Sequence, residues 1–279
     1  MKLRNILILL SMLFSLELSA QEVIAQRESD DRFAVLLDSG FQCGNQGRYA
    51  EAEHYMLQAI ALHPKHPINA MLWNNVAALR QLLGRNEASI EAYTRALDMD
   101  QDNLIVRANR ARLYALMGEH LKAITDYSIL VASKPQDELY RYQRAMSYML
   151  SKQYDLADID LSYLIEQNPS TLKGRIGYAL LETARGRYTE AERIYDYLVD
   201  KLPKNAEVYE GRARMYLARG MMGFAQRDIS KAFEYAGLVP SAELYRLRAQ
   251  ISRALGDAKA ALSDEQTASE IDRKGLQPR

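Results

Sequence analysis

GRYTEAE, residues 186–192, is the clearest of seven related segments that recur along the chain. The others, in order, are GRYAEAE (47–53), GRNEASI (84–90), GEHLKAI (118–124), KQYDLAD (152–158), GMMGFAQ (220–226) and GDAKAAL (256–262). From Gly84 to Gly220 the segments recur every 34 residues, and the two outer intervals are 37 and 36 residues. Self-similarity at such a period is the signature of a repeat architecture.

Each repeat reads as a helix, a short turn and a second helix. Small residues recur seven positions before each turn residue and five after it, where they would let two helices approach closely. They are Gly40, Ala77, Ala111, Ala145, Ala179, Ala213 and Ala249, then Ala52, Ser89, Ala123, Ala157, Ala191, Ala225 and Ala261. Pro64, Pro135, Pro169 and Pro203 end second helices, since proline cannot continue a helix. No segment alternates like a strand, so we expect an all-α solenoid.

This pattern resembles the tetratricopeptide repeat (TPR) family. With the turn glycine at repeat position 15, repeats start at Phe33, Ala70, Leu104, Glu138, Leu172, Ala206 and Ala242. The family's preferred residues appear in repeat two as Trp73, Ala77, Gly84, Tyr93 and Ala96, and in repeat three as Ala111, Tyr114, Gly118, Ala123, Tyr127 and Pro135. Lys152, Ser89 and Gln101 depart from the pattern. The resemblance implies a right-handed superhelical solenoid of about seven repeats over residues 33–271, with a tail at 272–279.

A charge pair recurs at repeat positions 7 and 23. Repeats three, four, six and seven carry Arg110 with Asp126, Arg144 with Asp160, Arg212 with Asp228 and Arg248 with Asp264; the other repeats carry neither partner. The two positions lie equally far from the turn, on antiparallel helices, so the side chains should face each other. We interpret them as structural, bidentate Arg–Asp pairs. The alternative is a ladder of arginines that binds anions.

The concave surface that the family forms from its first helices is the candidate partner-binding groove. Positions 2, 5, 9 and 12 tend to face it, and they make a second helical stripe beside the core stripe. The candidate residues are Leu139, Tyr142, Met146, Met149, Ile176, Leu180, Glu207, Glu210 and Arg214. Methionine and tyrosine suit an adaptable peptide-binding patch. Equally, these side chains could pack only against the neighbouring repeat.

The sequence contains no recognisable catalytic or metal constellation. Cys43, the one cysteine, falls at a packed repeat position, which indicates an inert buried thiol. His63 and His66 flank Pro64 without a third ligand, so we expect solvated loop histidines rather than a metal site. Phosphate-binding and nucleophile-elbow motifs are missing. The residues with which TPR co-chaperones bind an acidic tail are also missing, since Ala108 and Tyr142 occupy their places. We therefore predict no enzyme activity and no cofactor.

The amino terminus has the three parts of a secretory signal peptide. Lys2 and Arg4 precede an apolar run from Ile6 to Leu16, and Ala20 offers a cleavage point. The run is shorter than the ~20 residues of a transmembrane helix. Residues 1–20 are thus predicted to be a cleaved signal, with an uncleaved anchor as the alternative. Residues 21–32 are expected to form a flexible lead.

Composition limits the partners. The chain has 279 residues with 36 basic and 36 acidic side chains, which argues against binding to nucleic acid through phosphate neutralisation. We expect an exported, periplasmic or secreted scaffold that binds a protein or peptide along the groove, with no transmembrane segment after signal cleavage. The first alternative is a permanent subunit of an envelope-assembly or secretion complex, and the second is an enzyme with an unrecognised site.

Overall fold

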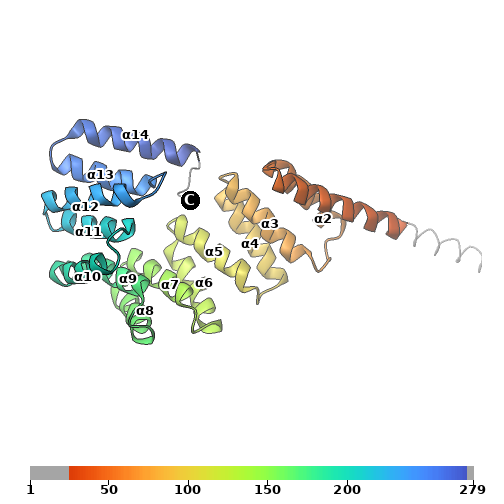
Figure 1. Cartoon of the computed structure of the whole chain (residues 1–279). Helices are drawn as coiled ribbons and strands as arrows, with labels where there is room; N and C mark the ends of the chain where they lie inside the picture. The colour runs from red at the N-terminus through yellow and green to blue at the C-terminus, as the bar shows by residue number, and fades with distance from the viewer. Residues whose placement is uncertain (1–24, 275–279) are drawn as a thin grey trace, which may run out of the picture. The chain divides into compact units, whose positions relative to one another are not determined.

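The computed structural model describes residues 25–274, and within that range it contains helices and no strands (Figure 1). Residues 25–45 form a first helix that precedes α2. The helices that follow are α2 (Tyr49–Leu62), α3 (Asn69–Leu82), α4 (Asn86–Met99), α5 (Leu104–Leu116), α6 (His120–Ser133), α7 (Glu138–Leu150), α8 (Tyr154–Gln167), α9 (Leu172–Ala184), α10 (Tyr188–Lys201), α11 (Ala206–Ala218), α12 (Met222–Tyr235), α13 (Ala242–Ala254) and α14 (Ala258–Lys274). From α5 onward, each first helix begins at the residue where the repeat numbering starts its repeat.

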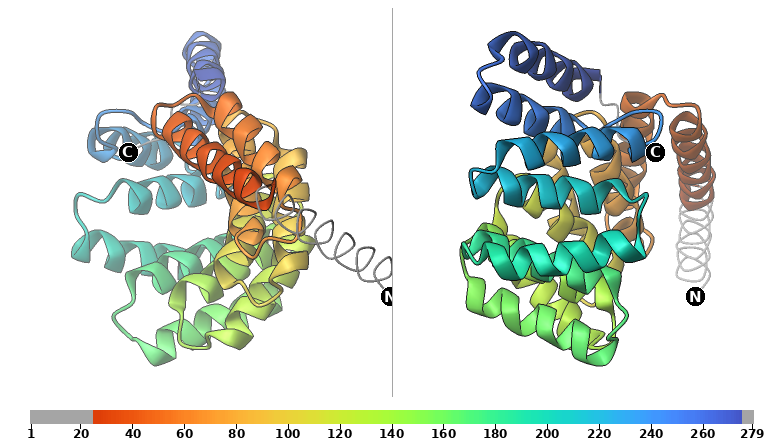
Figure 2. Two further views of the ribbon diagram at one scale, coloured as in Figure 1. Left: turned by 90° about the vertical axis from the view of Figure 1, so that its right-hand side faces the viewer. Right: turned by 60° about the vertical axis from the view of Figure 1, so that its left-hand side comes forward.

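The chain divides into two compact units between α5 and α6. In the first unit, α2, α3, α4 and α5 pack in chain order around a core that includes Trp73 and Tyr93. In the second unit, each helix packs on the next, and the first helices α7, α9, α11 and α13 also contact one another in sequence. Figure 2 shows α11 to α14 following one another as stacked layers. This stacking is what a solenoid requires, because one hairpin cannot bury its own apolar face.

Each repeat turns through a residue in the left-handed region. Six of the seven turn residues are glycines with φ between 72° and 86°, as at Gly84 (φ 72°) and Gly256 (φ 86°). The next residue donates its N–H to a carbonyl five residues back, for example Arg85 to Arg80 at 2.8 Å, which closes the end of the first helix. Lys152 adopts φ 61° in the same place without being glycine, and such a conformation costs roughly 1–2 kcal/mol.

Close approach of the two helices depends on the small residues at repeat positions 8 and 20. Their alanines are buried in every repeat, as Ala145 and Ala157 show with no exposed surface. Ser89 replaces alanine in repeat two, and its hydroxyl donates a 2.7 Å hydrogen bond to the carbonyl of Ala77. A polar side chain is therefore accommodated in the helix contact because its partner carbonyl lies directly opposite.

The structure differs from the sequence prediction at both ends of the described range. Residues 25–32, which the sequence predicts to belong to a flexible lead, are helical and continue into repeat one. The side chain of Gln26 donates to Asp30 one turn ahead at 2.9 Å, and Ser29 contacts His63, so local and tertiary contacts stabilise this helix. At the other end α14 continues to Lys274, past the predicted limit of the solenoid.

The predicted signal, residues 1–20, lies outside the described residues. No helix in the described range is both long and apolar enough to cross a bilayer.

Replacing Gly177 of α9 with alanine should destabilise the protein. An added Cβ would lie 2.6 Å from Leu161 Cδ2 and 3.0 Å from Tyr142 Cε2, so the contact between repeats four and five would have to open. We expect a loss of about 1–3 kcal/mol in the free energy of unfolding, measured by urea titration.

Gly223→Ala is the matched control for this change. Gly223 is also helical, but its added Cβ would meet no atom within 4 Å. That variant should be neutral or more stable by about 0.4–1 kcal/mol. Equal effects of the two substitutions would contradict the packing explanation.

Candidate functional site

The Arg and Asp side chains at repeat positions 7 and 23 meet in the second unit. Arg144 donates from Nε to Asp160 Oδ2 at 2.8 Å and from Nη2 to Oδ1 at 2.7 Å. Arg212 with Asp228 and Arg248 with Asp264 repeat this two-bond geometry. Burial makes the pairs consequential, since the Asp160 residue is only 1% exposed. A planar guanidinium matches a carboxylate in this way, whereas a lysine would not.

The electrostatics follow from these bonds. The hydrogen bond to Asp160 raises the pKa of Arg144, and Asp264 does the same for Arg248. For Arg212, burial opposes the charged form most strongly, yet the hydrogen bond to Asp228 leaves its pKa raised. These arginines stay charged at all physiological pH values.

The fourth predicted pair, Arg110 with Asp126, would join the two units and stays a prediction. Within its own unit, Arg110 on α5 donates to Thr94 Oγ1 at 3.1 Å and lies over the ring of Tyr114. Asp126 on α6 is buried.

A second set of ion pairs joins successive repeats, and the sequence reasoning missed it. An acid at position 21 of one repeat binds an arginine of the next. Glu53 binds Arg80 at 2.7 Å and Arg85 at 2.5 Å. Asp158 binds Arg185, and Glu192 binds Arg219, both at 2.6 Å. In all three pairs the arginine follows its acid by 27 residues, and Arg185 and Arg219 share repeat position 14. This fixed spacing was the signal that the sequence offered.

Cation–aromatic stacking between positions 4 and 26 was also missed. Position 4 is usually aromatic in the TPR family. In this chain the aromatic residue and the cation exchange positions between repeats. Arg95 lies over Trp73 at 4.7 Å and Lys231 over Tyr209 at 5.5 Å, with the ring at position 4. In repeats four and five the arginine is at position 4 instead. Arg141 lies 3.7 Å from the ring centre of Tyr163, and Arg175 lies 4.7 Å from that of Tyr197. Covariation of two positions within one chain was the available signal.

The predicted groove residues divide into buried and accessible groups. Tyr142 and Ile176 are buried, with 9% and 5% of their surface exposed, so they pack between repeats and offer little to a partner. Burial, and then the charge of Glu207, raises the pKa of Tyr142 to about 12. Leu139 is exposed, and half-buried side chains accompany it at Met146, Met149 and Leu180. The burial of Tyr142 and Ile176 favours the packing alternative for these two residues.

The carboxyl-terminal part of the predicted groove is charged. Arg214 binds Glu210 at 2.8 Å along α11. The side chain of Glu207 reaches solvent, but neighbouring atoms withhold enough water from its carboxylate to raise its pKa. The charge of Glu210 adds to this effect and Lys173 opposes it. This surface carries acidic and basic side chains in equal number, Glu207 and Glu210 against Lys173 and Arg214.

Exposed apolar residues recur at both ends of three first helices. Positions 2 and 13 are three helical turns apart and so lie on one face of a helix. They are Met71 and Leu82 on α3, Ile105 and Leu116 on α5, and Leu139 and Leu150 on α7, and all six are exposed. In repeats five to seven these positions carry Lys173, Glu207 and Glu243, then Ala184, Ala218 and Ala254. We call the six side chains the apolar stripe residues, or the apolar stripe; four lie on the first unit and two, Leu139 and Leu150, on the second.

The remaining candidate residues are placed as follows. Cys43 is a buried free thiol. His63 is half-buried rather than solvated, since Phe33 meets its ring edge-on with centroids 4.9 Å apart and Asp30 lies 3.5 Å from Nε2. His66 is exposed. Across residues 25–273 no group of three or more His, Cys, Asp or Glu side chains could hold a metal ion.

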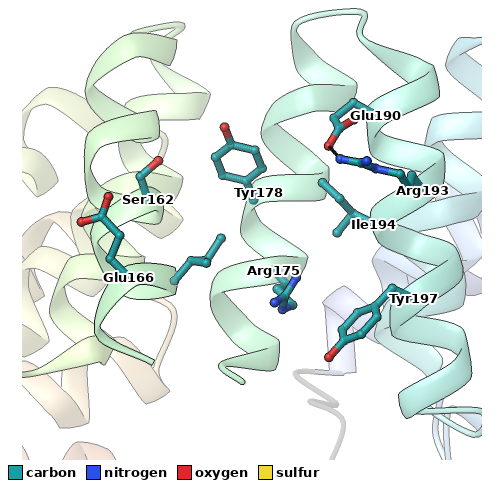
Figure 3. A pocket seen from close by; sticks show the side chains of 9 residues that line it. Ser162, Glu166, Arg175, Tyr178, Glu190, Arg193, Ile194 and Tyr197 are labelled. Carbon is teal, nitrogen blue, oxygen red and sulfur yellow. Dashed lines mark hydrogen bonds and ion pairs between the residues drawn. The ribbon is translucent and has the colours of Figure 1, made fainter. Parts of the chain in front are cut away.

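A pocket of about 520 Å³ lies on the second unit between α8, α9 and α10 (Figure 3). Its walls mix apolar and charged side chains: Ser162, Ile165 and Glu166 from α8, Arg175 and Tyr178 from α9, and Glu190, Arg193, Ile194 and Tyr197 from α10. No pattern in the sequence predicts this pocket. Its volume is in the range of small-ligand and anchor-residue pockets.

Family comparison agrees with this geometry. Profiles described as tetratricopeptide repeat match residues 31–102, 79–138 and 179–236. A crystal structure of a tetratricopeptide repeat protein from Parabacteroides merdae is 31% identical, covering 86% of this chain and 93% of its own, with a TM-score of 0.78. The chain belongs to the tetratricopeptide repeat family. Its fold class is the all-α TPR solenoid that the sequence predicts, with about seven repeats.

More distant TPR structures share the fold alone. A thermophilic TPR protein from Thermus thermophilus is 20% identical over 67% of this chain and 98% of its own, with a TM-score of 0.54. No protein of curated function matches the chain. TPR solenoids are generally non-enzymatic scaffolds for protein–protein interaction, so the family supports that coarse function for this chain.

A double-mutant cycle on Arg144 and Asp160 tests whether the buried pairs hold the TPR hairpins together. We expect a coupling energy of about 0.5–3 kcal/mol from urea unfolding, because the two side chains are in direct contact and largely buried. Arg193 with Glu190 serves as the control, since this exposed pair lies at 2.6 Å and should couple by about 0.5 kcal/mol or less. Additive effects at Arg144 and Asp160 would remove the structural role.

Proposed function

We propose that this TPR protein is an exported, non-enzymatic scaffold that binds a partner polypeptide along the surface formed by its first helices. The observation that carries the proposal is the recurrence of the apolar stripe residues, on α3 and α5 in the first unit and on α7 in the second. Single exposed apolar residues are normal on protein surfaces, but six at two fixed repeat positions are a pattern. Packing does not require them, because repeats five to seven have charged residues or alanine at the same positions.

The stripe suits a partner that presents apolar side chains at intervals. Met146 and Met149 lie half-buried on α7, where flexible side chains can adapt to different partner residues. Tyr142 beneath them is fixed by its contact with Gly177, so it supports the surface without forming it. A partner segment can therefore gain apolar contacts on α3 and α5 in the first unit and on α7 in the second, whereas α9, α11 and α13 present charged residues or alanine at the same positions.

The proposal includes export because residues 1–20 have the composition of a signal peptide. The alternative is that the same surface is permanently bound to other subunits of an envelope-assembly or secretion complex. The two differ in the size of the interface: an obligate contact buries roughly 2,000 Å² or more and is strongly apolar, whereas a groove for a peptide buries less.

Site-specific crosslinking tests the binding surface. Leu150 belongs to the stripe and Ile159 lies on the second helix of the same repeat, and each is 64% exposed. A photoreactive residue at position 150 should crosslink to a partner polypeptide in native cells, whereas the same residue at position 159 should not. In parallel, Leu150→Asp should weaken capture of that partner by about tenfold or more, which corresponds to about 1.4 kcal/mol, because a charge would replace an apolar contact. Equal crosslinking from both positions would exclude the stripe.

The export part is tested by the mass of the protein recovered from its native cells. Cleavage after Ala20 predicts a mature chain that starts at Gln21 and fractionates outside the cytoplasm. A charged residue in the apolar run, such as Leu10→Arg, should block processing, because the run must be apolar to be recognised. Recovery of the unprocessed wild-type chain from the cytoplasm would contradict export.

A further inference from the structure

Repeat five differs from its neighbours at the place where the Arg–Asp pairs form. Its position 7 is Tyr178 and its position 23 is Ile194. In repeats four and six the position 7 arginine also reaches position 25 of the preceding repeat: Arg144 donates to Ser128 at 3.3 Å and Arg212 to Asp196 at 2.7 Å. The equivalent residue before repeat five is Ser162, which instead donates to Asp158 at 3.0 Å.

Tyr178, Ile194 and Ser162 all line the pocket shown in Figure 3. Tyr178 donates its hydroxyl to Asp158 on α8, so its side chain does not pair with position 23 as an arginine would. The pocket therefore occupies the place that an Arg–Asp pair fills in repeats four, six and seven. It is a consequence of the missing pair rather than a general feature of the solenoid.

One arginine of the network remains in repeat five without its carboxylate. In repeat four, Arg141 stacks on Tyr163 and also donates to Asp160 at 3.1 Å. In repeat five, Arg175 stacks on Tyr197 in the same way, and its Nε and Nη2 donate to the carbonyl of Pro169. Since Ile194 replaces the aspartate, no carboxylate of the described residues pairs with Arg175.

We propose that this pocket binds an acidic side chain of a partner polypeptide, whose carboxylate pairs with Arg175 as Asp160 pairs with Arg141. Repeat four shows the arrangement: a carboxylate presented by a helix beside an arginine that stacks on a tyrosine. Ile165 and Ile194 provide apolar walls for the aliphatic part of the side chain and its flanking residues. The surface is separate from the apolar stripe, so the proposal does not rest on it.

The charges at the pocket favour a single carboxylate. Arg193 is neutralised by Glu190 at 2.6 Å, which leaves Arg175 as the cation without a carboxylate partner. Glu166 lies on the α8 side, whereas Arg175 lies beside Tyr197 on the other (Figure 3). Glu166 therefore limits how much negative charge the pocket accepts, and its neutralisation should strengthen binding of an acidic segment.

Methyl NMR of the full chain with labelled isoleucine δ1 methyl groups tests the proposal. The probe is acetyl-Leu-Glu-Leu-amide at millimolar concentration, and acetyl-Leu-Gln-Leu-amide is its uncharged match. We expect the Glu peptide to shift the Ile165 and Ile194 signals and leave Ile229, buried on α12, unchanged. Arg175→Gln should weaken this binding by about tenfold, because it removes a charge-assisted bond. Glu166→Gln should strengthen it.

Two further variants make the test specific. Ile194→Asp should pair with Arg175 within the chain, as in repeat four, and so exclude the Glu peptide. The double change Arg193→Gln with Glu190→Gln keeps the net charge and should alter affinity less than about twofold. If a variant fails to fold, the comparison of Glu and Gln peptides on the unchanged protein decides.

Three results would overturn the proposal. One is equal binding of the Glu and Gln peptides, and another is undiminished binding by the folded Arg175→Gln protein. The third is tighter binding of free hexanoate than of the Glu peptide, which would make the occupant a small acid instead of a polypeptide.

Discussion

The close contact between the two helices of each hairpin is the constraint on which this structure depends. Alanine at repeat positions 8 and 20, both fully buried in repeat four, leaves almost no side chain between the helices. At that separation each residue beside the contact faces one fixed partner on the other helix. The left-handed turn residue then fixes the hairpin, even at Lys152, where a side chain must be tolerated in that conformation.

Charge pairs specify how the hairpins are joined, because apolar stacking alone is not directional. Within a repeat, a bidentate bond such as Arg144–Asp160 fixes the register of the two helices. Between repeats, the contact of Glu53 with Arg80 and Arg85 ties one hairpin to the next. A buried pair gives little net stability after desolvation, but removing one partner leaves an uncompensated charge. We therefore regard these pairs as determinants of register.

The two candidate binding surfaces lie where particular repeats deviate from this regular pattern. The apolar stripe exists because repeats two to four keep exposed apolar residues where later repeats do not. The pocket exists because repeat five has Tyr178 and Ile194 in place of the Arg–Asp pair. In a solenoid each repeat contacts only its neighbours, so local changes of this kind create a surface without disturbing the whole fold.

The sequence by itself determined the helices, their turns and the residues that meet across each hairpin, because these contacts recur at fixed spacing along one chain. The repeat position of Tyr142 predicts a groove residue. Only the structure shows that Tyr142 packs closely against Gly177 of the next repeat and is buried. Tertiary structure alone decided which stripe residues stay exposed. It alone revealed the pocket beside Arg175, because a cavity depends on how three helices diverge and where long side chains turn.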